Sequence, residues 1–266
     1  MCFSLAACQD SSSSSESDEQ TQAAADQPDE AADGDVAACV AAGKLVVGIT
    51  DFEPMDYKDG DEWIGFDADM AKAFADSLGV DVEFMEIDWD NKILEINNKT
   101  IDCVWNGMTL TDEVTSSMDC SNAYMNNAQI VILPVDKADD YPDEDSLKEL
   151  TFAVESGSAG AAAAEKLGAA TVEVQNQASA LMEVAAGTAD AAIIDSLMAA
   201  AMVGEGTSYE DLTYTLSLTT EEYGVGFRKG SDLVEKFNEF IKDAYDDGSL
   251  MECAEKYGVQ AALIEQ

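Results

Sequence analysis

Short apolar runs typical of β-strands alternate along this chain with segments of helical periodicity, and the alternation occurs in two successive blocks. In the first block, residues 44–49 (KLVVGI) form a β-branched run that predicts a strand. Met70, Phe74 and Leu78 then recur at helical spacing in the segment 65–78. Further strands are predicted at 80–87, 101–105 and 129–133, with a short helix at 91–98. Such alternation favours an α/β fold with parallel strands.

The second block repeats this pattern from residue 151 onward. Strands are predicted at 151–154, 171–174 and 191–194, and helices at 159–167, 178–186 and up to 203. Two amphipathic helices, 232–246 and 249–257, close the chain. Two α/β blocks in succession predict two lobes, with a ligand bound in the crevice at the carboxyl ends of their strands.

The lobes are expected to share the chain unequally. We expect lobe 1 to comprise residues 37–133 and 222–266, and lobe 2 to comprise residues 134–221. The chain then crosses between the lobes twice, near 132–135 and near 219–224.

Composition excludes several classes of function. The net charge is −42, with a single arginine and twelve lysines, so a nucleic-acid partner is not expected. This charge favours either a solvated acidic surface or the steering of cationic solutes. The chain has no histidine and no C-x-x-C pair, which excludes Ser-His-Asp chemistry and common zinc motifs. We expect neither a cofactor nor a metal, and the chain has no apolar run long enough for a membrane span.

The N-terminus resembles a targeting signal. Residues 5–8 (LAAC) resemble a bacterial lipobox, which marks Cys8 for lipidation. Only seven residues precede Cys8 and none is basic, so we expect residues 1–8 to be the remnant of a truncated signal. Residues 9–36 are rich in Ser and acidic residues and predict a disordered tether. The alternative is an ordinary disordered tail without a lipid.

Several motifs, in order, resemble the polar amino-acid family of extracytoplasmic solute-binding proteins over residues 43–258. The matching segments are FEP (52–54) with GFDAD (65–69), DWD (88–90), ID (101–102) with NGMTLTDE (106–113), DCSNAY (119–124), VESGS (154–158), AD (189–190) with Asp195, and GVGFRKG (224–230).

The resemblance implies a two-lobed, Venus-flytrap fold of the periplasmic-binding-protein type with two hinge crossovers. It also implies an ABC-importer subunit that binds a small polar solute, an amino acid or an amine, and that contacts permease subunits. We expect an extracytoplasmic monomer that is attached only by a lipid anchor to the outer face of the cytoplasmic membrane. The alternatives are a dehydratase-type enzyme on the same scaffold and a ligand-sensing domain.

By the same resemblance, Asp195 is the carboxylate that takes a ligand's ammonium group, although an aspartate after a strand also suits a helix N-cap. Asn106, Gly107 and Thr109 lie where the family's first-lobe loop presents donors to a carboxylate. The alternative for this loop is a plain tight turn. Ser158 either binds the ligand or caps the following helix.

Two aromatic residues match the family's pocket walls. Phe52 and Trp89 occupy these positions and could hold a cation, although packing in the core explains Trp89 equally well.

One departure from the family pattern affects the expected ligand. Where the family has an arginine that grips a carboxylate, this chain has Val114. A ligand carboxylate is therefore expected to rest on neutral donors alone. Glu155 lies in the second-lobe turn, and Asp51 and Glu53 flank the Phe52 position. The pocket is therefore expected to be acidic and to suit a cationic or amine-bearing solute.

An exported protein can form disulfides. We expect Cys103 to pair with Cys120 and Cys39 with Cys253. The alternative is that all four are buried thiols.

Overall fold

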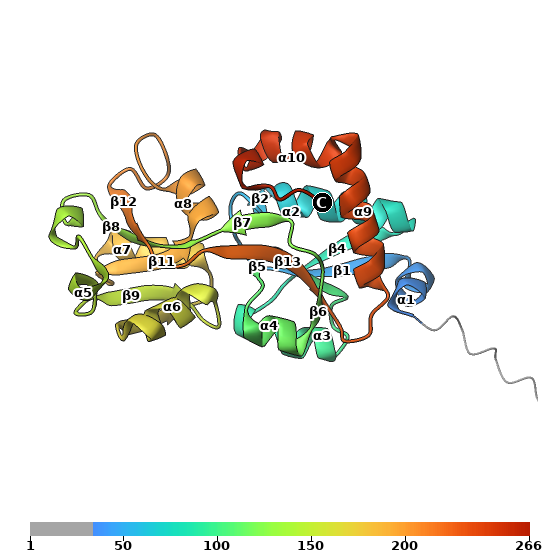
Figure 1. Ribbon diagram of the computed structural model, residues 1–266, viewed down its shortest axis with the longest axis horizontal. Helices are drawn as coiled ribbons and strands as arrows, with labels where there is room; N and C mark the ends of the chain where they lie inside the picture. The colour runs from blue at the N-terminus through green and yellow to red at the C-terminus, as the bar shows by residue number, and fades with distance from the viewer. Residues whose placement is uncertain (1–33) are drawn as a thin grey trace, which may run out of the picture. The chain divides into compact units, whose positions relative to one another are not determined.

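The protein, described by a computed structural model over residues 34–266, contains two larger β-sheets with helices packed on both faces of each (Figure 1). The predicted α/β class is confirmed. Cys8 and nearly all of the predicted tether lie outside the described residues. Within residues 34–266, no helix is long and apolar enough to cross a membrane.

The first sheet has the strand order β4-β1-β5-β13-β6, and β7 also pairs with β13. β1, β4 and β5 run parallel, whereas β13 runs antiparallel to β5. β1 is buried after its first residue, as expected for a strand with helices on both sides. The strands are β1 Lys44–Ile49, β4 Asp81–Glu86, β5 Cys103–Thr109, β6 Asp119–Cys120, β7 Met125–Asn127 and β13 Glu221–Phe227, beside a small hairpin of β2 Tyr57–Asp59 and β3 Glu62–Ile64.

Aromatic packing joins one face of the first sheet to its helices. Phe74 on α2 (Phe66–Leu78) meets Phe237 on α9 (Leu233–Asp247) edge to face, with centroids 5.5 Å apart. Trp105 of β5 lies 4.8 Å from the same Phe237 ring. Each such pair contributes about 0.5–1.5 kcal/mol beyond area burial.

The other face of the first sheet carries α3 (Lys92–Asn97) and α4 (Asp112–Ser117), which pack on Val46 and Val104. The remaining elements near this sheet are α10 Ser249–Tyr257 and the 3-10 helices η1 Trp89–Asn91 and η3 Gln260–Ala262.

The second sheet has the order β10-β9-β11-β8-β12. Alternate residues of β9 face opposite sides, as the pleat requires. Phe152 packs toward α6, and Ala153 belongs to the cluster that contains α7. The elements are β8 Gln129–Pro134, β9 Thr151–Glu155, β10 Ala170–Val174, β11 Ala191–Asp195, β12 Leu212–Ser217, η2 Ala138–Asp140, α5 Glu144–Leu147, α6 Ala159–Leu167, α7 Gln177–Ala186 and α8 Ser196–Met202.

The first crossing between the sheets falls earlier than predicted. β8 pairs with β11 and β12, so the chain leaves the first sheet before Gln129 rather than near residue 133. The second crossing, between β12 and β13, covers residues 218–220 and lies at the edge of the predicted range. The lobe boundaries themselves remain a prediction, and we propose that lobe 2 begins near residue 128.

The predicted tether ends too late. Helix α1 (Asp35–Ala42) already begins at Asp35, whereas the tether was expected to reach residue 36. Asp35 forms an ion pair of 3.0 Å with Arg228, which also pairs with Asp102 at 3.2 Å. These contacts fix the start of the helix, because the Arg228 guanidinium is buried and needs both carboxylates.

The structure contradicts both predicted disulfides. The cysteines within the described residues are all free thiols: Cys39, Cys103, Cys120 and Cys253. β13 lies between β5 and β6, with Phe227 opposite Cys103 and Gly226 opposite Cys120. Two strand spacings separate these cysteines by about 9–10 Å, which exceeds the limit of about 7 Å for a disulfide. Burial raises the pKa of the Cys39 and Cys253 thiols to about 12. The alternative of four buried thiols holds for Cys39 and Cys103, whereas Cys120 and Cys253 are only partly buried.

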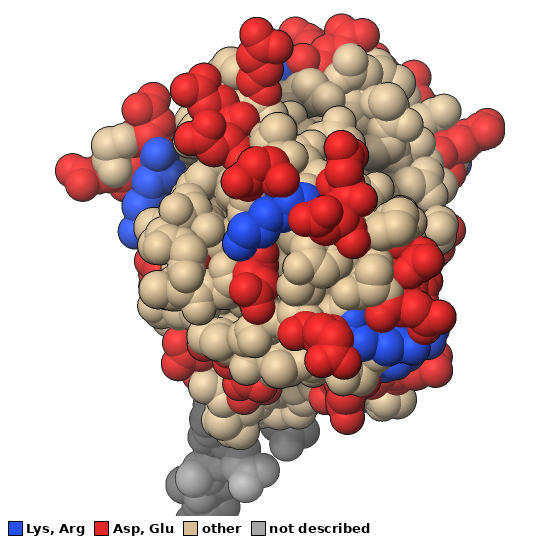
Figure 2. Space-filling view, turned by 90° about the vertical axis from the view of Figure 1, so that its left-hand side faces the viewer, with Lys and Arg blue, Asp and Glu red and all other residues tan. Residues whose placement is uncertain are grey.

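On one face of the molecule, acidic side chains are spread out instead of forming one patch (Figure 2). Figure 2 shows this for the face at the α5 and β9 end, where a few basic residues lie among many carboxylates. A charge distributed in this way supports solubility more than it marks a partner's binding site.

Candidate ligand-binding site

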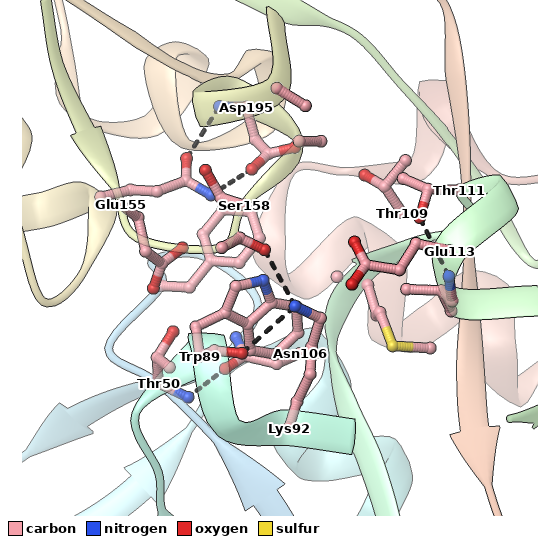
Figure 3. A pocket seen from close by; sticks show the side chains of 18 of the residues that line it. Thr50, Trp89, Lys92, Asn106, Thr109, Thr111, Glu113, Glu155, Ser158 and Asp195 are labelled. Carbon is pink, nitrogen blue, oxygen red and sulfur yellow. Dashed lines mark hydrogen bonds between the residues drawn. The ribbon is translucent and has the colours of Figure 1, made fainter. Parts of the chain in front are cut away.

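A cavity of about 230 Å³, lined by both polar and apolar side chains, lies where the carboxyl ends of β1, β5, β9 and β11 meet (Figure 3). This is smaller than the roughly 300–1,000 Å³ of pockets for drug-sized ligands, so it suits a smaller solute. Eight of the nine predicted ligand-binding residues line it: Phe52, Trp89, Asn106, Gly107, Thr109, Glu155, Ser158 and Asp195. The ninth, Asp51, follows β1 but is not part of the lining.

Asp195, at the end of β11, is buried and held by side chains from several elements. Its Oδ1 accepts from Asn127, from Gln129 at 2.9 Å and from the Tyr223 hydroxyl at 2.9 Å, and Oδ2 accepts from Gln177. Asp195 occupies the N-cap position of α8, as its alternative role predicted, but its side chain makes no capping bond there. Burial raises the pKa of Asp195 to about 7, against the lowering effect of Gln177.

Glu155, at the end of β9, is a second buried carboxyl group, with 3% of its surface exposed. Its Oε1 has no hydrogen-bond partner among the described residues. Burial, and next the charge of Asp195, raise the pKa of Glu155 to about 8. An unpaired buried acceptor is costly, so this oxygen marks a place for a donor supplied by a ligand.

The first-lobe loop offers fewer donors than predicted. The Gly107 N–H donates to Asp67 Oδ2 at 2.6 Å, and the Thr109 hydroxyl donates to Glu221 Oε2 at 3.0 Å. Both groups are therefore committed within the protein. Asn106 differs, because its Oδ1 accepts from the Thr50 N–H while its buried Nδ2 has no partner among the described residues.

The backbone at residue 107 requires glycine, because its φ is +53°, in the left-handed region that other residues rarely adopt. A Cβ atom there would lie 2.5 Å from Phe52 Cε1. Phe52 and Trp89 line the cavity, and both are also buried in hydrophobic clusters. The position of Trp89 is therefore compatible with both of its predicted roles. Ser158 caps α6 by accepting from the Ala161 N–H at 3.1 Å, and it lines the cavity as well.

Lys92, at the start of α3, was not predicted and lines the cavity. Its Nζ donates to the Trp89 carbonyl at 3.2 Å and to the Gly157 carbonyl at 2.9 Å. The expectation that the pocket offers only neutral donors is therefore wrong. Lys92 lies four residues before Ile96, the other buried residue of α3, and this spacing could have indicated a buried lysine.

Val114 is buried at the edge of the cavity, on α4. The position at which the motif resemblance leads one to expect an arginine is thus apolar. Arg228 does not take its place, because it is held by Asp35 and Asp102 and does not line the cavity.

Two helix-covered β-sheets whose strand ends together line a small cavity are typical of two-lobed solute-binding proteins. Residues 45–260 match the family of bacterial extracellular solute-binding proteins, family 3, and the chain belongs to this family.

Related proteins and solved structures agree with this assignment. The arginine-binding extracellular protein ArtP of Bacillus subtilis (strain 168) is 31% identical over 226 residues, which cover 80% of this chain and 86% of ArtP. A probable histidine-binding protein of Neisseria gonorrhoeae is 30% identical over 222 residues, which cover 79% of this chain and 81% of that protein.

Among solved structures, the ancestral amino acid-binding protein AncCDT-1, a precursor of cyclohexadienyl dehydratase, has a TM-score of 0.77 at 32% identity, covering 84% of this chain and 99% of that chain. An amino acid ABC transporter substrate-binding protein of Streptococcus pneumoniae Canada MDR_19A, bound to L-arginine, has a TM-score of 0.77 at 27% identity, covering 88% and 100%.

The family confirms the predicted two-lobed fold, the extracytoplasmic location and a solute-binding role instead of an enzymatic one. The dehydratase alternative is not favoured, since AncCDT-1 is itself described as an amino acid-binding protein.

Proposed function

We propose that this protein is the solute-binding subunit of an ABC importer and that it captures an amino acid whose side chain carries hydrogen-bond donors. Relatives named for arginine and histidine support this ligand class. The observation that carries the proposal is the pair of buried carboxyl groups, Asp195 and Glu155, at the second-sheet side of the cavity (Figure 3).

The free acceptor positions of this pair suit an amino acid. A carboxylate has about four acceptor positions, and Asp195 Oδ2 receives a single donor, from Gln177. It can therefore accept a ligand's α-ammonium. Glu155 Oε1 accepts nothing from residues 34–266, so it can receive a donor from the ligand's side chain, which lies between Phe52 and Trp89.

A bound amino acid would touch residues of both sheets. Asp195 and Glu155 belong to the second sheet, whereas Trp89 and Asn106 belong to the first-sheet side. Binding would thus favour the closed arrangement, because the ligand contacts both lobes only there.

Thermal unfolding in the presence of single amino acids and of putrescine tests the proposal. At a ligand concentration of about 100 times Kd, an amino acid such as L-arginine should raise Tm by about 5–10 °C. Asp195→Asn should remove the shift, and Asp139→Asn, an exposed control on the same lobe, should keep it. Tight binding of glutamate or aspartate would overturn the acidic-pocket interpretation, and no shift with any amino acid would overturn the ligand class.

We further propose that Cys8 is lipidated and anchors the protein to the outer face of the cytoplasmic membrane. The LAAC motif and the Ser-rich acidic stretch behind it support this. Labelled palmitate should be incorporated into the wild type and not into Cys8→Ser. Equal labelling of both would contradict the anchor.

We also propose a monomer that docks on permease subunits. The cavity is complete within one chain. Light scattering should give a mass near 28.3 kDa, and a dimeric mass would contradict this.

A further inference from the structure

Lys92 is a buried cation in the ligand cavity that the proposed amino-acid chemistry has not used. It is 6% exposed, and no carboxylate among residues 34–266 comes within the 4.0 Å of an ion pair. A buried ammonium without an anion costs on the order of several kcal/mol. The position of Lys92 is therefore explained if an anion arrives with the ligand.

The hydrogen bonds of Lys92 leave it one free proton. An ammonium has three N–H donors, and two of them go to the carbonyls of Trp89 and Gly157. The Nζ also lies 5.0 Å from the centroid of the Trp89 ring. Figure 3 shows the Nζ directed into the cavity, while Glu155 and Asp195 lie on the side of the second sheet. The third N–H can thus meet a ligand group.

The other hydrogen-bond donors around the cavity cannot fully replace Lys92 as the partner of a ligand anion. The Gly107 N–H and the Thr109 hydroxyl already donate to Asp67 and Glu221. Val114 stands at the position of the family's arginine. Of the lysines and arginine within the described residues, Lys92 is the one that lines the cavity.

The nearby acidic groups do not neutralise Lys92 directly. Glu113, Glu155 and Asp90 act on it through their charges, and burial lowers the pKa of Lys92 against them. Burial also raises the pKa of Glu155 to about 8, which weakens this carboxyl group as a counter-ion at neutral pH. An added ligand carboxylate would be a better one.

We propose that Lys92 binds the α-carboxylate of the ligand, in place of the arginine that Val114 replaces. This inference rests on the proposed amino-acid function. The ligand then lies with its carboxylate at Lys92, next to the start of α6, and its ammonium at Asp195. Because Lys92 also donates to Gly157 on the second-sheet side, the carboxylate would be bound where the two lobes meet.

Calorimetric titration with matched ligands tests this assignment. The probes are L-arginine, L-histidine and L-glutamine, each paired with its α-carboxamide, which lacks the negative charge. Lys92→Gln keeps a donor for the Gly157 carbonyl and removes the charge. It should raise the Kd of the tightest-binding acid by about 10- to 100-fold and that of its amide by less than about threefold.

Lys92→Arg keeps the test decisive if Lys92→Gln unfolds, and it should keep the preference for the acid over the amide; loss of that preference would overturn the inference. If Lys92→Gln folds, adding Val114→Arg to it should restore the preference. Lys166→Met, an exposed lysine on α6, is the control and should bind both probes as the wild type does.

Failure of the Lys92 inference can be distinguished from failure of the proposed function. If the wild type binds an amino acid but Lys92→Gln weakens the acid and the amide equally, Lys92 only connects the lobes and the inference is overturned. If the wild type binds none of the three amino acids, the proposed function fails, and the inference fails with it.

Discussion

Replacing Gly107 by alanine should damage both the fold and the cavity. The residue has φ +53°, and the left-handed conformation costs an alanine about 1–2 kcal/mol. Its Cβ would also lie 2.5 Å from Phe52 Cε1 and 3.1 Å from Tyr223 Cε2. Both rings are fully packed, and overpacking of this kind costs about 1–3 kcal/mol more. We therefore expect a total loss of about 2–5 kcal/mol.

A second glycine separates the two contributions. Gly168, at the end of α6, has φ +80°, and a Cβ atom added there would meet no atom within 4 Å. Gly168→Ala should cost only the backbone contribution of about 1–2 kcal/mol. Urea unfolding monitored by circular dichroism measures both. Equal losses in the free energy of unfolding for the two variants would refute the reasoning from the Phe52 contact. An unchanged affinity of Gly107→Ala for amino acids would refute the expected damage to the cavity.

Three other outcomes follow from the structure. Burial raises the folded-state pKa of Glu155 to about 8 and of Asp195 to about 7, so the ligand-free protein should lose stability as pH rises from about 4 to 8. A plot of Tm against pH should therefore fall over this range, and Glu155→Gln should make the fall less steep. An unchanged slope in Glu155→Gln would contradict this explanation. Arg228→Met removes the cation from the partly buried carboxylates of Asp35 and Asp102 and should cost about 1–3 kcal/mol in urea unfolding. Lys229→Met at an exposed position should cost little, and equal losses would count against the ion-pair account. The intact mass should be the same with and without reductant, and a gain of about two protons on reduction would restore a disulfide.

Apolar spacing predicted most of the regular elements correctly. Met70, Phe74 and Leu78 indicated α2, and KLVVGI indicated β1, because burial on a helix or sheet leaves a local period in the sequence. The pocket was predictable for a related reason. Its carboxyl groups follow directly after buried strands, and the ends of parallel strands meet at one edge.

The errors concern contacts between distant parts of the chain. The Cys103–Cys120 pairing failed because β13, more than a hundred residues later, inserts between their strands. The availability of the Gly107 N–H was overestimated because Asp67, 40 residues earlier, accepts it. The spacing of Lys92 and Ile96 could have indicated that Lys92 is buried, but its contact with the Gly157 carbonyl, 65 residues further on, could not be predicted from that spacing. No local pattern encodes these pairings.

The central claim is that a buried carboxylate in this cavity binds the ammonium of an amino acid. Calorimetric titration of the wild type and of Asp195→Asn with L-arginine, L-histidine and L-glutamine tests it most directly. The account predicts one binding site per chain in the wild type for at least one of them, and a Kd raised about 30-fold or more in Asp195→Asn. Equal affinities of the two proteins, or no binding of any of the three to the wild type, would contradict it.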